Sequence, residues 1–291
     1  MTQQKILRST LASGAFALLT LGATSAVAAD WSDTYVGWRT GRTFAEPFNS
    51  EDISKNIFNF GHISGYKYGT NFLNVDFLLS DSKDPAGAGS TNGAQEAYVV
   101  YRHTLDVAKI TGAKLGFGPV KTVNFTLGFD ANAKTDAGYN SKKRMFVAGP
   151  TFPIDIPVGF LNVGVYMLWE SNAPYNTFTK TSTPRYTYDT HPMLNLVWGV
   201  PLGSTGLSFE GFANFIASKG KNEFGADTAA ETNIDAQVMY DASGVVGAKP
   251  KTLKVGLGYQ YWKNKFGNDA SGPAGKGAFA KTPMLRTEFH F

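Results

Sequence analysis

Cysteine is absent from the 291 residues, so the chain has no disulfide framework, no cysteine-based metal site and no thiol nucleophile. Histidine is scarce, and His62, His103, His191 and His290 lie far apart without the spacing of a metal-binding motif. A nucleophile elbow of the form G-x-S-x-G is also missing. We therefore expect no metal, no cofactor and no enzymatic activity.

Charge of one sign is not concentrated anywhere, and no basic run is long enough to indicate a nucleic-acid partner. After residue 28 the chain also lacks an apolar run long enough for a transmembrane helix. Glycine and aromatic residues are instead frequent, with 32 glycines and 14% aromatics. An exported chain of this composition can enter a membrane only as a closed β-barrel, whose alternating pattern hides its apolar residues from hydropathy averaging.

Residues 1–28 have the pattern of a secretory signal peptide. Lys5 and Arg8 form a basic start, residues 11–27 are apolar or small, and Ala26-Val27-Ala28 fits a cleavage site. Cleavage there removes two of the 27 basic residues and leaves 25 against 23 acidic ones, a net charge of +2. The remaining residues, 29–291, are predicted to form one barrel in the outer membrane.

Apolar residues recur at every second position in several segments. Residues 123–131, 161–170, 234–241 and 253–262 all follow this period, which is typical of strands with one apolar face. The final run, residues 285–291, alternates in the same way and ends on Phe291. An aromatic end of this kind is typical of the closing strand of an outer-membrane barrel, and we expect the barrel-assembly machinery to bind it.

The whole pattern predicts an all-β, antiparallel up-and-down barrel of about twelve strands that is monomeric and spans the lipid bilayer. The expected strands cover residues 33–45, 56–67, 71–80, 95–105, 121–132, 143–154, 159–171, 186–200, 206–218, 232–242, 251–263 and 282–291. Most have roughly the 9–11 residues that a tilted strand needs to cross the apolar layer.

The connections between these strands alternate in length. With a periplasmic N-terminus, long outer loops fall at 46–55, 81–94, 133–142, 172–185, 219–231 and 264–281, and phage or toxin contact is expected there. The intervening turns are mostly tight, except for 106–120 and 243–250. A soluble β-sandwich, the alternative fold, has no reason to keep this asymmetry.

Three stretches resemble the Tsx-like nucleoside-specific channels and the related outer envelope proteins. They are residues 106–119 with Phe117-Gly118-Pro119, residues 207–215, and the N-terminal series at 30–33, 44–49 and 65–72. The resemblance implies a monomeric twelve-stranded barrel with a narrow pore, through which nucleosides diffuse while aromatic and polar groups hold them weakly in series. The chain has fewer aromatic residues near its N-terminus than the best-known members.

Positions opposite in parity to the aliphatic ones are expected to line the pore, where a channel needs a polar wall and weak serial contacts. Both signs of charge occur there, which favours a neutral polar solute over a bare ion. Phe72, Tyr98, Tyr166 and Phe212 have the same parity and are expected to stack on a base. The remaining predicted pore-lining residues are Arg39, Asp76, Glu96, Arg102, Asp130, Glu170, Asp189, His191, Asn195, Glu210, Asp235, Gln237, Lys254, Gln260, Arg286 and Glu288.

Two other functions stay open on the sequence. One is a non-transporting outer-membrane barrel, a structural protein or receptor whose lumen is filled by side-chain pairs. The other is an outer-membrane enzyme, which would need a serine, a histidine and a carboxylate together at one rim. An open lumen lined by aromatic and charged groups distinguishes the channel from both.

Overall fold

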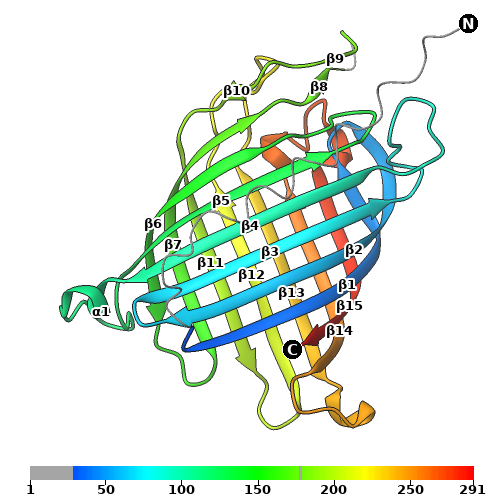
Figure 1. Ribbon diagram of the computed structural model, residues 1–291. Helices are drawn as coiled ribbons and strands as arrows, with labels where there is room; N and C mark the ends of the chain where they lie inside the picture. The colour runs from blue at the N-terminus through cyan, green and yellow to red at the C-terminus, as the bar shows by residue number, and fades with distance from the viewer. Residues whose placement is uncertain (1–28, 177–178) are drawn as a thin grey trace, which may run out of the picture.

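The computed structural model describes residues 29–176 and 179–291. The predicted signal peptide, residues 1–28, lies outside the described residues. Twelve long strands form a ring in chain order, and β1 pairs with β15 to close it (Figure 1). The ring strands are β1 (Trp31–Glu46), β2 (Asn49–Tyr66), β3 (Gly69–Ser80), β4 (Gln95–Asp106), β5 (Asn124–Lys134), β6 (Arg144–Ile154), β7 (Phe160–Asn172), β11 (His191–Pro201), β12 (Leu207–Ile216), β13 (Glu231–Asp241), β14 (Leu253–Lys263) and β15 (Phe279–His290).

Every neighbouring pair in the ring is antiparallel, so the prediction of a twelve-stranded antiparallel barrel is confirmed. Helical structure in the described part is limited to α1 (Val107–Thr111) and the short 3-10 turns η1 (Ser243–Val246), η2 (Lys265–Gly267) and η3 (Gly275–Ala278). No helix among the described residues is both long enough and apolar enough to cross a membrane.

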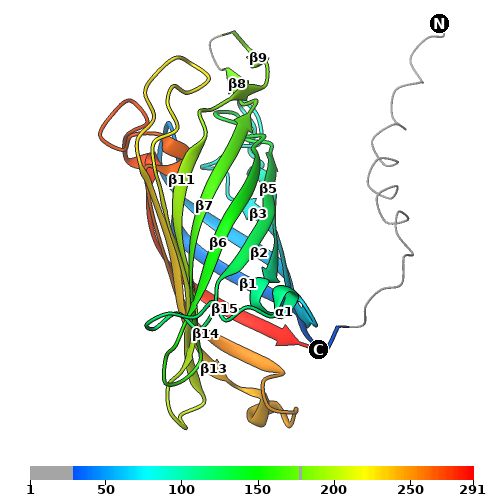
Figure 2. The same cartoon turned by 90° about the vertical axis from the view of Figure 1, so that its left-hand side faces the viewer.

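The two ends of the barrel differ. One end carries α1 and the C-terminus, and the other carries the longer loops with the short strands β8 (Tyr175–Asn176), β9 (Thr181–Ser182) and β10 (Tyr186–Thr187) (Figures 1 and 2). Residues 67–68, 155–159 and 202–206 make short connections at the α1 end. We refer to the opposite end as the outer end, because the longer loops of outer-membrane barrels are extracellular.

Two expected boundaries are wrong. Residues 46–55 do not form a long loop, because β1 and β2 continue past the predicted limits and join through Pro47 and Phe48 alone. Polar residues such as Asp52 look like a loop in the sequence, but Ile53 is fully buried on the inner face of the hairpin. The strand expected at 186–200 begins at His191, because β10 pairs only with the end of β7 and the chain then bends into β11.

Side chains alternate between a lipid-facing and an inner surface along each strand. Leu257 on β14 and Leu285 on β15 are Cα partners near mid-strand, and they are 64% and 55% exposed. Trp38, Trp169 and Tyr259 are likewise exposed on outward positions. The outer surface is therefore an apolar band that only a membrane can cover.

Replacing Leu257 with arginine tests this surface. A cation on the lipid face near the bilayer midplane costs about 2–4 kcal/mol of folding free energy. Denaturant titration of refolding into lipid vesicles measures the loss. Val245→Arg in η1 is the matched control, because Val245 is 80% exposed at the α1 end and its replacement leaves the free energy unchanged. Equal effects of the two variants would contradict the placement of the membrane.

Candidate pore and its outer cap

Strand register determines which predicted pore residues face inward, because Cα partners on neighbouring strands lie on the same face of the sheet. Arg39 on β1 and Arg286 on β15 are Cα partners, so they lie on the same, inner face. The partners on each further strand are assigned to the inner face in the same way. The register places on the inner face Arg39, Phe72, Asp76, Glu96, Tyr98, Arg102, Asp130, Tyr166, Glu170, His191, Asn195, Glu210, Phe212, Asp235, Gln237, Lys254, Gln260, Arg286 and Glu288. Asp189 is different, since it lies exposed between β10 and β11.

Two arginines on adjacent strands each bind a carboxylate from elsewhere in the ring. The Arg39 guanidinium lies 2.5 Å from Asp76 Oδ2, and Asn59 Nδ2 donates to the other oxygen of Asp76 at 2.8 Å. Arg286 pairs with Asp235, and its Nη1 donates to Gln237 Oε1 at 2.6 Å. The local charge is therefore balanced in the middle of the lumen.

Two further ion pairs continue this layer. Arg102 Nη1 lies 2.5 Å from Asp130 Oδ1, and Lys254 Nζ lies 3.1 Å from Glu210 Oε1. The side chains of Arg39 and Arg102 are each 18% exposed, and that of Lys254 is 19% exposed. These charged groups keep contact with solvent, so the lumen has a polar, wetted wall from its middle toward the α1 end.

Tyr166 lies in different surroundings. Its ring packs in an apolar cluster on the inner face, made of Met145, Val147, Tyr166, Leu168, Met193 and Ile216. Its hydroxyl bonds with that of Thr151 at 2.7 Å, and only 5% of the residue is exposed. The expected role of Tyr166 in stacking on a solute is therefore blocked by packing in this structure, whereas Phe72 and Phe212 remain partly exposed.

Above the wetted layer, three lysines surround one carboxylate, which we call the Glu46 cluster. Glu46 pairs with Lys55, and its oxygens lie 3.3 Å from Lys134 Nζ and 3.0 Å from Lys265 Nζ. Asp84 adds a second carboxylate 3.0 Å from Lys134. The lysine side chains are only 1–7% exposed. Because β1, β5 and the β14–β15 loop meet here, this cluster links distant parts of the ring.

A second buried group lies on the neighbouring part of the wall. Lys219 Nζ lies 2.6 Å from Glu170 Oε1, and Lys143 Nζ lies 3.9 Å from the other oxygen of Glu170. His191 contributes its ring, whose Nδ1 bonds with the carbonyl of Asp189 at 2.8 Å. Glu231 accepts from Trp262 Nε1 at 2.6 Å. The predicted residues Glu170 and His191 thus belong to a buried network of the outer end.

Loop residues complete what we call the outer cap, which consists of the Glu46 cluster and the residues Phe48, Tyr139, Tyr188, Glu223 and Phe266. Glu223 accepts from the Tyr139 hydroxyl at 2.6 Å and from the Tyr188 hydroxyl at 2.5 Å. The Tyr139 ring lies 6.3 Å from Phe48 and 6.3 Å from Phe266, centroid to centroid. These residues come from five connections, so the loops are joined across the barrel opening.

Burial raises the pKa of Tyr139 and of Tyr188, and the charge of Glu223 adds to the effect. A phenol with a raised pKa in the folded state stabilises it fully below pH 10, and this contribution is lost as the pH rises further. At pH 11 we expect the two phenols together to lower the free energy of unfolding by about 2–3 kcal/mol relative to pH 8. Urea titrations at pH 8 and 11 measure the loss, which the variant Tyr139→Phe/Tyr188→Phe should lack. An identical loss in that variant would contradict the assignment.

Sequence reasoning missed most of the cap. Lys55 and Lys134 have inward parity near the outer ends of their strands, and this parity was the available signal. Lys265 and Glu223 lie in loops, where periodicity gives no direction. No group of three or more metal-binding side chains occurs among the described residues.

Comparison with known proteins supports the fold. No protein-family model and no curated protein sequence matches the chain. Among solved structures, an outer membrane channel from Pseudomonas putida F1 superposes with a TM-score of 0.51 at 11% identity, covering 93% of this chain and 98% of that one. The KdgM porin superposes with a TM-score of 0.42 at 7% identity, covering 88% of this chain and 99% of that one. The translocator domain of autotransporter NalP from Neisseria meningitidis superposes with a TM-score of 0.44 at 10% identity, covering 89% of this chain and 88% of that one. The superposition on the Pseudomonas putida channel agrees with the closed β-barrel fold described above.

Proposed function

We propose that the chain is an outer-membrane channel for passive diffusion of nucleosides or similar small polar solutes, exported with the aid of the signal peptide at residues 1–28. The main observation in support is the layer of ion pairs that contact solvent around the lumen: Arg39–Asp76, Arg102–Asp130 and Lys254–Glu210. A passive pore needs such weak, serial polar contacts and no reacting group.

The balance of charge supports the choice of solute. Each basic group of this layer contacts an acidic one, so a bare ion of either sign meets both attraction and repulsion. A neutral solute with hydroxyl and amide groups can instead exchange hydrogen bonds with the carboxylates and guanidinium groups as it passes. Phe72, Tyr98 and Phe212 supply aromatic faces on the same wall, on which a base stacks.

One observation favours a second function. The outer cap buries its lysines almost completely, which is what a non-transporting barrel with a filled lumen requires. In the channel proposal the cap is a closed state of the outer mouth, and its loops move aside to admit solute. In the alternative it is permanent, and the barrel acts as an envelope structural protein or receptor.

Swelling of protein-containing liposomes distinguishes the two. We expect adenosine and thymidine to enter faster than the corresponding monophosphates, because the nucleosides are neutral. A barrel without transport gives the rate of empty liposomes for every solute. Equal rates for nucleosides and for a neutral disaccharide would keep the channel and contradict the selectivity for nucleosides.

A further inference from the structure

The closing seam of the barrel is only partly paired. The ladder between β1 and β15 runs from Tyr35 and His290 to Gly41 and Met284, where it ends. The next residue of β15 is Pro283, which has no N–H to donate. Beyond it, side chains replace the ladder, since Thr43 Oγ1 donates to the Lys281 carbonyl at 3.0 Å and Thr282 Oγ1 donates to the Thr43 carbonyl at 2.7 Å.

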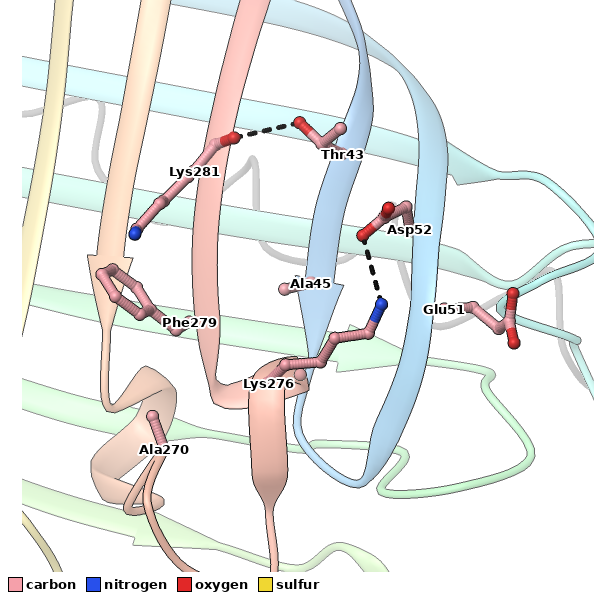
Figure 3. Close-up of a pocket in the computed structure, with 9 residues that line it drawn as sticks. Thr43, Ala45, Glu51, Asp52, Ala270, Lys276, Phe279 and Lys281 are labelled. Carbon is pink, nitrogen blue, oxygen red and sulfur yellow. Dashed lines mark hydrogen bonds and ion pairs between the residues drawn. The ribbon is translucent and has the colours of Figure 1, made fainter.

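A groove of about 510 Å³ lies at this unpaired end, and we call it the seam groove (Figure 3). It is formed by β1, β2, β15 and the β14–β15 loop. Its lining residues are Thr43, Ala45, Glu51, Asp52, Ala270, Lys276, Gly277, Phe279 and Lys281.

The seam groove opens toward the membrane side and not toward the lumen. Phe279 and Lys281 alternate along β15 with Ala280 and Thr282, which are buried on the inner face. Behind them, Phe44, Ile53, Ile57 and Met284 pack into an apolar layer on the lumen side. An occupant of the groove must therefore come from the surrounding membrane or from the outer medium.

Cationic and aromatic groups occur together in the groove. Lys281 Nζ lies 4.5 Å from the centroid of the Phe279 ring, and Phe279 contacts Tyr261 edge-on with centroids 5.0 Å apart. Among the residues that the structure describes, Lys281 forms no ion pair. Lys276 is paired with Asp52 at 3.6 Å, but both side chains are more than 60% exposed, so this bond is weak and exchangeable.

We propose that the seam groove binds a phosphate group of a phosphorylated glycolipid in the outer leaflet. Lys281 supplies the first positive charge and Lys276 the second, after its ammonium leaves Asp52. Phe279 and Tyr261 lie beside Lys281 on outward positions, where they contact the start of the acyl chains. The inference rests on the outer-membrane location in the proposed function, but it does not depend on whether the lumen conducts.

The acidic residues define how much charge the groove accepts. Glu51 and Asp52 line the same groove and repel a second anion beside the first. We therefore expect one phosphorylated lipid for each barrel, held by ammonium groups whose attraction to anionic headgroups is screened by salt.

Native mass spectrometry of the full chain, folded in detergent, tests the proposal. The probes are a bisphosphorylated glucosamine lipid, its dephosphorylated form and inorganic phosphate. We expect one phosphorylated lipid per barrel and about thirtyfold weaker binding by Lys276→Gln/Lys281→Gln, because each surface lysine contributes roughly fivefold to binding of anionic lipid. The control variant Lys109→Gln/Lys121→Gln removes two exposed lysines of the α1 end, and it should bind like the unchanged protein.

Three results would overturn the proposal. They are equal lipid binding by both double variants, equal binding of the dephosphorylated lipid, and displacement of the lipid by inorganic phosphate at comparable concentration, which would indicate a site for a soluble anion. A failure of the liposome-swelling experiment leaves this result unaffected, since binding is measured without transport.

Discussion

Replacing Glu46 with glutamine should lower the free energy of unfolding by about 3–5 kcal/mol, the usual cost of removing one partner from a buried ion pair. Glutamine preserves the shape but not the charge that faces Lys55, Lys134 and Lys265. Among the described residues, Glu46 is the ion-pair partner of Lys265. Burial already lowers the pKa of this lysine. Urea titration in detergent measures the change.

The same variant should also increase conductance. It leaves Lys265 without its carboxylate partner, while Lys55 and Lys134 keep those of Asp84 and Asp136, and the excess positive charge loosens the loops that cover the outer mouth. Asp227→Asn is the matched control, since the Lys221–Asp227 pair of the β12–β13 loop is exposed on both sides and its loss should change neither quantity. Unchanged stability and conductance in Glu46→Gln would show that the cluster does not hold the cap.

Replacing Arg286 with glutamine should make the pore select for cations. Arg286 neutralises Asp235 in the middle of the lumen, and its loss leaves a carboxylate without a partner. One uncompensated charge about 10 Å from a passing ion, at an effective dielectric constant of about 20, stabilises a cation and destabilises an anion by about 1.7 kcal/mol each. The permeability ratio of cations to anions should therefore change on the order of a hundredfold. Reversal potentials in a salt gradient measure the ratio.

Two variants make this prediction specific. Lys109→Gln changes the net charge by the same amount at the exposed α1 end, so it should leave the reversal potential unchanged. Arg286→Gln/Asp235→Asn removes both members of the pair and should restore the original selectivity. A shift that persists in the double variant would mean that Arg286 acts through the structure of the barrel and not through its charge.

Alternation in the sequence was sufficient to predict the barrel and the inward parity of the wall. A strand has a period of two, so a correct strand boundary fixes the face of every residue along it. Arg39, Asp130 and Arg286 all follow from that rule. The sequence did not predict the hairpin at Pro47. The start of β2 extends beyond the membrane, so its outward residues are polar and the alternation expected of a membrane-spanning strand is absent there.

The contacts that these inward residues make could not be predicted from the sequence. Lys265 and Glu46 are separated by 219 positions, and neither alternation nor composition relates them. Tyr166 has inward parity, but whether it lines the pore or fills a cluster depends on Met145 and Met193 from neighbouring strands. Periodicity therefore predicts direction, while packing and pairing depend on contacts that only the folded chain specifies.

The most direct test of transport is single-channel recording of residues 29–291, refolded into a planar bilayer. We expect small conductance steps in the unchanged protein that fall saturably as adenosine is added, and larger or longer steps in Glu46→Gln. Absence of any conductance in both proteins would contradict the channel and favour a closed structural barrel.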